Sequence, residues 1–330
     1  MAFQTKALKD YNRNSNWQYQ IGLNFIPVLF ELLNELDSSS PSSICIVDYG
    51  SSEGYNSMSI LQSALAQFRL HSSTPIQIIH TDLPENNWTA LFTTINNSSN
   101  SYKHLPNIYC SAVGQSFYHQ LVPSNSVHLG YSTYAFHYLS QIPKRTGSPS
   151  LLFPEAASQL ILDLKQNLSH RLNELVNKGL LMFSAPAKSE DGSYPIGDLM
   201  FRVLKNCVLK EIISESDLLN FFWPTYPFDE AQIRQVLDSF EGKIEVKLLE
   251  IKKSVCPFYT EFINGGELED YRIKLSGMLG TILRNAFLRT LTGSDDQKEA
   301  VYERVKRELE QSINNDEVSM SYYTVIIQKL

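Results

Sequence analysis

Residues 44–54, ICIVDYGSSEG, form a short apolar run that leads into an acid and two glycines. The apolar, partly β-branched residues 45–47 are typical of a central parallel strand. Asp48 stands at the carboxyl end of that strand, where open α/β sheets place their ligands. Gly50 and Gly54 allow the backbone to turn tightly and to approach a ligand closely. The segment therefore predicts a nucleotide-binding turn after a buried strand.

The glycine spacing narrows the kind of ligand. A dinucleotide site has the pattern G-x-G-x-x-G, whose glycines surround a pyrophosphate at a helix N-terminus. From Asp48 to Gly54 the pattern is instead D-x-G-x-x-x-G, which disfavours a diphosphate. S-adenosylmethionine fits better, because it carries a methionine moiety and a ribose and needs no phosphate site. A strand and tight turn with no ligand is the alternative that this motif alone leaves open.

A second acid ends the next predicted strand. Residues 76–82, IQIIHTD, are followed by LPENNW at 83–88. A carboxylate suits a ribose because it can accept two charge-assisted hydrogen bonds from a cis-diol, so Asp82 is a candidate ribose ligand. Asp, Pro and Asn in a row also begin helices. Asp82 could therefore cap a helix, and the two roles are compatible.

Six motifs in order resemble those of the SABATH family of carboxyl methyltransferases. This family acts on salicylic, benzoic, jasmonic and indole-acetic acids, with caffeine-pathway N-methyltransferases among its relatives. The resemblance spans nearly the whole chain. The matching segments are YNRNSNWQ at 11–18 (family S-Y-x-x-N-S-x-x-Q), 48–57 (D-L-G-C-S-S-G-P-N-T), 82–86 (D-L-P-x-N), SFY at 116–118, 132–143 (S-S-Y-S-x-x-W-L-S-Q-V-P) and FWPTY at 222–226 (F-x-x-P-x-Y).

The resemblance implies a set of S-adenosylmethionine contacts. The methionine end and the sulfonium would lie near Tyr11 and Ser15, above the loop of Asp48, Gly50 and Asn56. The ribose and adenine would meet Asp82 and Leu83, and the adenine slot would be formed by Ser116 and Phe117. For Phe117 the alternative is an ordinary core residue, because an apolar side chain after a strand is usually buried.

The resemblance also implies an acceptor pocket that positions its substrate without a dedicated catalytic residue. A carboxylate is already ionised at pH 7, so in-line methyl transfer to it requires positioning and no general base. Gln18 matches the family glutamine that donates to the carboxylate. Tyr138 replaces the usual tryptophan donor; its phenol can also donate, but along the ring axis. His137 either donates to the substrate or packs, and the predicted walls are Tyr134, Trp223 and Tyr226.

Two departures mark a divergent member of the family. The glycine-rich M-x-G-G-x-G start is replaced by MAFQTKALKD at 1–10, and Tyr138 replaces tryptophan. Together with Glu53 and Tyr55 in the Gly50 loop, they prevent the assignment of a named plant hormone as the substrate.

The pattern of apolar runs predicts an α/β fold. By resemblance it is a class I methyltransferase: a Rossmann-like, mostly parallel sheet with an antiparallel C-terminal edge strand and an α-helical cap. Residues 1–187, 241–255 and 313–330 would form the S-adenosylmethionine-binding domain, and 188–240 with 256–312 the cap. The predicted strands lie near 44–49, 76–81, 107–113, 126–131, 179–185, 244–252 and 320–328. The predicted helices cover 18–36, 55–70, 86–97, 155–178, 268–291 and 296–312.

Composition limits the partners and the compartment. The 330 residues carry a net charge of −7, which disfavours binding to nucleic acid. No signal-length or membrane-spanning apolar run is present. Four scattered cysteines indicate reduced thiols in a cytoplasmic protein, and no histidine or cysteine spacing indicates a metal site. By resemblance the protein is expected to be a homodimer.

Two other functions remain open from the sequence. One is N-methylation of a small heterocycle, for which His137 and the tyrosines would face a neutral ring. The other is a non-catalytic S-adenosylmethionine-binding protein. The presence of Asp48, Asp82 and Gln18 argues against the latter.

Overall fold

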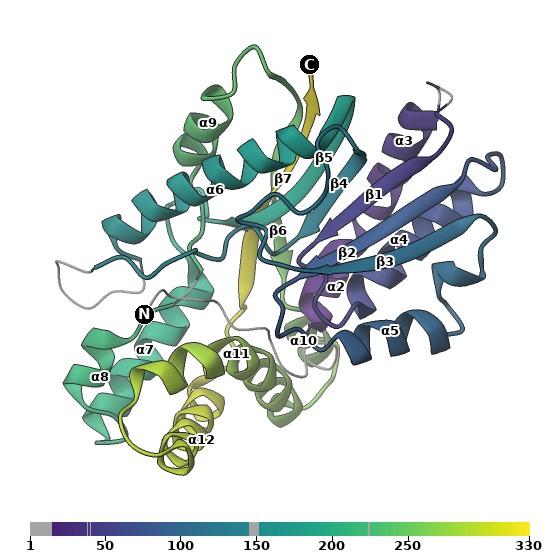
Figure 1. The fold of residues 1–330 in the computed structure, drawn as a ribbon. Coiled ribbons are helices and arrows are strands. Elements are labelled where there is room, and N and C mark those ends of the chain that lie inside the picture. The colour runs from purple at the N-terminus through teal and green to yellow at the C-terminus, as the bar shows by residue number, and fades with distance from the viewer. Residues whose placement is uncertain (1–14, 38, 40, 145–151, 224) are drawn as a thin grey trace.

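A seven-stranded sheet organises the computed structural model, which describes residues 15–37, 39, 41–144, 152–223 and 225–330 (Figure 1). The strand order is β3-β2-β1-β4-β5-β7-β6. The first five strands are mutually parallel, and β7 runs antiparallel to both β5 and β6. The strands are β1 (Ile44–Tyr49), β2 (Ile76–Asp82), β3 (Ile108–Gly114), β4 (Val127–Thr133), β5 (Leu175–Ala187), β6 (Ile244–Val255) and β7 (Ser319–Lys329).

The predicted class of a mostly parallel sheet with an antiparallel C-terminal strand is confirmed. The C-terminal strand β7 lies inside the sheet, however, between β5 and β6, and β6 is the edge strand on that side. Side-chain chemistry explains this order. Residues 320–328 of β7 are all buried, whereas β6 exposes charged side chains such as Lys252 and Lys253. Exposed charges of this kind are typical of edge strands, where they discourage pairing with another chain.

Helices cover both faces of the sheet, and β1 shows how it separates two cores. Ile44 and Ile46 pack in one core with α3 and α4, while Val47 and Tyr49 pack in the other with α6. The helices on the first side are α2 (Asn16–Leu23), α3 (Ile26–Asp37), α4 (Tyr55–Phe68) and α5 (Trp88–Asn97), and those on the second are α6 (Pro154–Glu174) and α9 (Glu230–Asp238). The helix predicted over 18–36 is thus two helices, which separate at residues 24–25.

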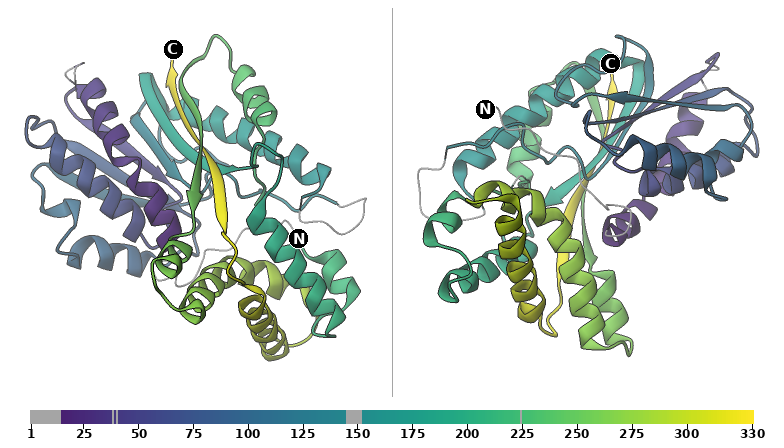
Figure 2. Two further views of the ribbon diagram at one scale, coloured as in Figure 1. Left: turned by 180° about the vertical axis from the view of Figure 1, so that it is seen from behind. Right: turned by 60° about the horizontal axis from the view of Figure 1, so that its bottom comes forward.

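The remaining helices gather beyond one end of the sheet in every view (Figure 1, Figure 2). In this group α11 packs against α12 and α12 against α7, and the Tyr302 hydroxyl donates to the Gly280 carbonyl at 2.8 Å. By contrast, α9 packs against α6. The division into a cofactor domain and a cap stays a prediction. The helices of this group are α7 (Pro195–Leu209), α8 (Glu215–Asn220), α10 (Pro257–Ile263), α11 (Leu268–Thr290) and α12 (Asp295–Ser312). A 3-10 turn, η1 (Tyr102–His104), lies elsewhere, against α4.

Candidate functional site

Asp48, at the end of β1, is held by two donors from within the protein. Its Oδ2 accepts the Ser57 hydroxyl at 2.5 Å and lies 2.8 Å from Nδ1 of His80. His80 is the register partner of Asp48 on β2, and its Nε2 lies 2.6 Å from the Tyr102 hydroxyl. The Asp48, His80 and Tyr102 side chains are all buried. This chain of hydrogen bonds fixes the direction of a carboxylate that would otherwise be costly to bury.

Asp82, at the end of β2, accepts backbone hydrogen bonds from two loops. The Ser52 N–H donates to Oδ2 and the Leu83 N–H to Oδ1, each at 2.7 Å. Burial raises the pKa of Asp82 to about 6 against the lowering effect of these two bonds. The cap of α5 is Asn87, which accepts from the Ala90 N–H at 3.1 Å. Asp82 therefore does not cap that helix.

Gly50 makes the turn after β1 possible. Its φ is +86°, and a Cβ built on it would lie 2.4 Å from Cβ of Ala135. Its N–H and that of Ser51 both donate to the Thr81 carbonyl, at 2.9 and 3.0 Å. The loop beneath the predicted cofactor is thus tied to the end of β2 and packed against the segment after β4.

We expect Gly50→Ala to destabilise the protein by about 1–3 kcal/mol, because it combines a left-handed backbone with a close contact that cannot relax freely. Urea denaturation measures this change. Gly192→Ala is the matched control, since Gly192 also has a positive φ of +80° but nothing lies within 4 Å of the Cβ that the substitution adds. Equal losses in the two variants would show that the contact with Ala135 is unimportant.

The amino-terminal motif meets the Gly50 loop. Asn56 Nδ2 lies 3.1 Å from the Ser15 hydroxyl and 3.3 Å from its carbonyl oxygen. Two residues predicted to border the methionine end of the cofactor therefore contact each other directly. Tyr11, predicted to lie with them, falls outside the described residues.

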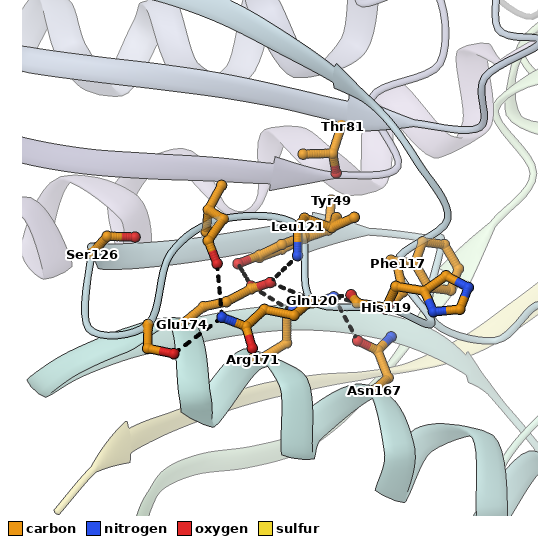
Figure 3. Close-up of polar contacts among 12 residues, drawn as sticks. Tyr49, Thr81, Phe117, His119, Gln120, Leu121, Ser126, Asn167, Arg171 and Glu174 are labelled. Atoms are coloured by element: carbon orange, nitrogen blue, oxygen red, sulfur yellow. Dashed lines mark hydrogen bonds and ion pairs between the residues drawn. The ribbon is translucent and has the colours of Figure 1, made fainter.

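A buried ion pair holds the loop that carries Ser116 and Phe117 (Figure 3). Arg171 on α6 makes a two-pronged ion pair with Glu174, with both N–O distances 2.8 Å. The same guanidinium donates to the carbonyls of Phe117 at 2.9 Å and His119 at 2.8 Å. It also stacks over the Tyr49 ring, 4.4 Å from its centre. Arg171 therefore holds the backbone of the loop. The side chains of Ser116 and Phe117 are partly buried and keep some exposure.

One cavity brings together five of the six predicted acceptor residues. Its empty space, open mouth included, is about 530 Å³. The predicted residues in its wall are Gln18, Tyr134, His137, Tyr138 and Trp223. Tyr226 does not line it: its side chain is buried in the core that contains α6, with the Lys188 Nζ 5.3 Å from its ring centre.

The cavity wall also contains eight residues that the sequence motifs did not identify. They are Pro186, Tyr194, Ile196, Thr225, Met278, Leu279, Ile282 and Met320. The α11 members recur on one helix face, a pattern that equally describes core residues. Thr225 could have been found from its place within the 222–226 motif. The contact of His80 with Asp48 could not be predicted, because a lone histidine within a strand can have many structural roles.

The wall is electrically neutral but rich in polar atoms. Among its described residues none is Asp, Glu, Lys or Arg. Burial lowers the pKa of His137 to about 3, so its imidazole is neutral at pH 7. Burial and then the Asp82 carboxylate raise the pKa of Tyr138, and Tyr138 contributes to a raised pKa at Tyr194. Tyr138 therefore lines the cavity and also interacts electrostatically with the predicted ribose acid.

Metal binding and membrane insertion find no support in the described part of the chain. No three His, Cys, Asp or Glu side chains gather there in a way that could hold a metal ion. Every helix in that part is too short or too polar to span a bilayer.

Several characterised proteins are similar to this chain. A methyltransferase named FUS9 from Gibberella fujikuroi is 29% identical over 238 residues, which cover 70% of this chain and 66% of that protein. The salicylate/benzoate carboxyl methyltransferase of Arabidopsis thaliana is 28% identical over 269 residues, covering 73% of this chain and 70% of that protein. The matches span about two thirds of the fungal relatives, 64% to 66% of their length.

A solved structure and a family model support the relationship that these sequence similarities indicate. A structure of loganic acid methyltransferase with S-adenosylhomocysteine superposes with a TM-score of 0.73 at 18% identity, covering 100% of this chain and 98% of that one. The family model described as SAM dependent carboxyl methyltransferase matches residues 5–330. The chain therefore belongs to the S-adenosylmethionine-dependent carboxyl methyltransferase family, as its motifs predicted.

Proposed function

We propose that this protein forms the methyl ester of a small carboxylic acid by transferring the methyl group of S-adenosylmethionine to the acid's carboxylate. The observation that carries the proposal is the neutral cavity lined by Gln18 and Tyr138, with Tyr138 in electrostatic interaction with Asp82. The relatives named for salicylate and benzoate support an acceptor of modest size.

The polar groups in the cavity suit a carboxylate acceptor. Gln18 and Tyr138 are the proposed donors to its two oxygens. Neither is charged, so neither neutralises the nucleophile as an ammonium or guanidinium would. The absence of a carboxylate in the described wall also fits, because an acceptor that is already ionised needs no general base. Catalysis then rests on positioning, which can contribute about 7–11 kcal/mol in the best intramolecular cases.

The residues around the loops fit S-adenosylmethionine. When bound, this molecule supplies an electrophilic methyl group on a positive sulfur. Asp82 would accept from the ribose hydroxyls, with Leu83, Ser116 and Phe117 around the adenine. Ser15, with Tyr11 by resemblance, would lie at the methionine end together with Asp48, Gly50 and Asn56. The hydrogen bond between Ser15 and Asn56 supports their grouping in one site.

Cofactor affinity should depend on pH through Asp82. Hydroxyl donors favour the ionised carboxylate, so ligand binding lowers a pKa that is about 6 in the unliganded protein. Affinity for S-adenosylhomocysteine should therefore be constant above about pH 7 and weaken as the pH falls through 6, by up to tenfold per pH unit. Calorimetry between pH 5 and 8 measures this. Asp82→Asn should bind weakly and lose the dependence; a pH-independent wild type would contradict the ribose assignment.

Tyr138→Phe tests the second donor. It keeps the ring and its packing and removes only the hydroxyl. If the phenol donates to the carboxylate, kcat/KM for the acid should fall about tenfold or more, the cost of one hydrogen bond to a charged group. Steady-state kinetics measures the change. The Asp82 carboxylate also raises the pKa of Tyr138, so a loss confined to cofactor affinity would reassign Tyr138 to the cofactor.

The reaction itself is tested by comparing each acid with its amide. The protein should methylate acids and leave the corresponding amides unchanged, because an amide offers no anionic oxygen. Its rate should also fall as the pH drops through the acid's own pKa near 4–5, while the fold persists. Methylation of a xanthine with no turnover of any acid would instead favour N-methylation.

Three further features belong to the same proposal. The four free cysteines of the described residues suit the reducing cytoplasm. The net charge of −7 supports a protein that does not bind nucleic acid. A homodimer rests on family resemblance, and sedimentation of the purified protein would test it.

A further inference from the structure

The Asp48 carboxylate uses only one of its two oxygens within the described part of the protein. Oδ2 accepts from the Ser57 hydroxyl at 2.5 Å and lies 2.8 Å from Nδ1 of His80. Oδ1 accepts no hydrogen bond from any described residue. Because Asp48 is only 2% exposed, water reaches little of this carboxylate. Oδ1 is therefore available to a ligand group that donates a hydrogen bond.

The charge of Asp48 is not balanced by a strong base of the protein. Among the described residues its ion-pair partner is His80, and none of their Lys or Arg side chains lies within ion-pair distance of it. Burial, and in part the Asp48 carboxylate, raise the pKa of Asp82, so the two acids interact unfavourably when both are ionised. A buried carboxylate without a basic partner is costly. Asp48 is therefore suited to a ligand group that carries positive charge.

The methionine end of the cofactor carries such a group. Ser57, which donates to Asp48, directly follows Asn56, and the Asn56 Nδ2 lies 3.1 Å from the Ser15 hydroxyl. By resemblance Ser15 and Asn56 border the methionine end of S-adenosylmethionine. The α-ammonium of that end is positive, and an ammonium group donates but does not accept. It matches Oδ1 of Asp48 both in charge and in hydrogen-bonding role.

The His80 ring is itself held by a second contact. Its Nε2 lies 2.6 Å from the Tyr102 hydroxyl, and the two rings lie within 18° of parallel. Both side chains are fully buried. An ionised carboxylate only accepts, so Nδ1 of His80 donates to Asp48, and the neutral ring with that tautomer accepts from Tyr102 at Nε2. A partner behind a ligand-binding side chain fixes the direction in which that side chain points.

We propose that His80 and Tyr102 are positioning residues for the cofactor: they hold Oδ2 of Asp48 so that Oδ1 accepts from the α-ammonium of S-adenosylmethionine. This rests on the assignment of Asp48 to the methionine end under the proposed function. In this arrangement neither His80 nor Tyr102 needs to touch the cofactor. Their contribution should therefore be measurable only through Asp48, and only with ligands that carry the amino group.

The first experiment compares two ligands of the wild-type protein by calorimetry. One is S-adenosylhomocysteine, and the other is its analogue in which hydrogen replaces the α-amino group. The analogue should bind about tenfold more weakly or worse, the loss of a hydrogen bond between charged groups. Asp48→Asn should remove most of this preference, because asparagine carries no charge.

The second experiment links the preference to the two positioning residues. His80→Leu removes both ring nitrogens and should lower the preference for S-adenosylhomocysteine over the analogue by about tenfold. His80→Asn keeps an amide donor at the place of Nδ1, so it should recover most of the preference. Tyr102→Phe removes only the hydroxyl and should lower the preference by about threefold, since the ring of His80 loses one of its two partners.

A matched control and a double variant separate positioning from a general effect on the fold. His128 also lies in the sheet, where its Nδ1 accepts from the Cys45 N–H at 3.1 Å, and His128→Leu should leave the ligand preference unchanged. In the Asp48→Asn background, His80→Leu should cause no further loss of affinity for S-adenosylhomocysteine, because both changes act through one contact. Urea denaturation verifies that each variant is folded.

Each outcome decides between these proposals. Equal wild-type affinity for the two ligands overturns the ammonium contact and leaves carboxyl methylation standing. Equal losses for both ligands in His80→Leu, or a further loss in the Asp48→Asn background, overturn the positioning role. If His80→Leu does not fold, a wild-type preference in Tyr102→Phe overturns that role instead. A wild-type protein that does not bind S-adenosylhomocysteine overturns the proposed function as well.

Discussion

Arg171→Met should lower the free energy of unfolding by about 3–5 kcal/mol, the cost of breaking a buried ion pair by removing one partner. Arg171 and Glu174 are both fully buried. Among the described residues, the substitution leaves the Glu174 carboxylate with the Tyr49 hydroxyl at 2.7 Å and the Leu121 N–H at 2.5 Å as its donors. It also removes the hydrogen bonds that the guanidinium donates to the carbonyls of Phe117 and His119. Urea denaturation measures the loss.

The control and the conservative change sharpen this result. Lys165→Met alters a partly exposed cation on the same helix, and it should change stability by no more than about 0.5 kcal/mol. Arg171→Lys keeps the charge but not the planar fork, so it should recover only part of the loss. If the free energy of unfolding of Arg171→Met lies within about 1 kcal/mol of the wild-type value, the ion pair does not hold the loop.

Asp82→Ala should weaken S-adenosylhomocysteine binding by about 1.5–3 kcal/mol, roughly tenfold to a hundredfold, the range for a charge-assisted hydrogen bond. The variant loses the proposed acceptor for the ribose hydroxyls. It also releases the Ser52 and Leu83 N–H groups, each bonded to the carboxylate at 2.7 Å. Calorimetry at pH 7.5 measures the affinity.

A neighbouring acid provides the control for Asp82. Glu85 lies three residues further along the chain and is exposed, so Glu85→Ala removes the same charge from the same loop without touching the carboxylate site. It should leave the affinity nearly unchanged. Unchanged affinity in a folded Asp82→Ala variant would instead move the ribose contact to another residue.

The sheet could be predicted from the sequence because polar residues and glycines mark where its apolar strands end. Strand β1 is an apolar run that stops at Asp48 and Gly50, and each of the seven predicted strands overlaps one in the structure. The break between α2 and α3 was missed although proline marks it. Pro27 stands in the first turn of α3, where proline is common, and Asn24 is exposed. Buried residues on both sides, Ile21, Phe25 and Leu29, continue the apolar periodicity across the break and conceal it.

The acceptor cavity was only partly predictable for a similar reason. Gln18, His137 and Tyr138 lie in motifs with recognisable spacing. Met278 and Leu279 lie on α11, where an apolar stripe can face either a cavity or a core, and only the packing of α11 over the sheet end decides between them. The position of Tyr226 in the opposite core shows the same limit, because its motif fixed its neighbourhood but not the direction of its side chain.

The central claim is methyl transfer to a carboxylate, and the most direct measurement is the base lability of the transferred label. After incubation with tritiated S-adenosylmethionine and a panel of small carboxylic acids, the product is treated with dilute alkali. A methyl ester hydrolyses and releases its label as volatile methanol, whereas a methylated ring nitrogen retains it. We predict that the incorporated label becomes volatile and that the product has the mass of the methyl ester. Label that stays with the product, or no incorporation with any acid by a protein that binds S-adenosylhomocysteine, would contradict carboxyl methylation.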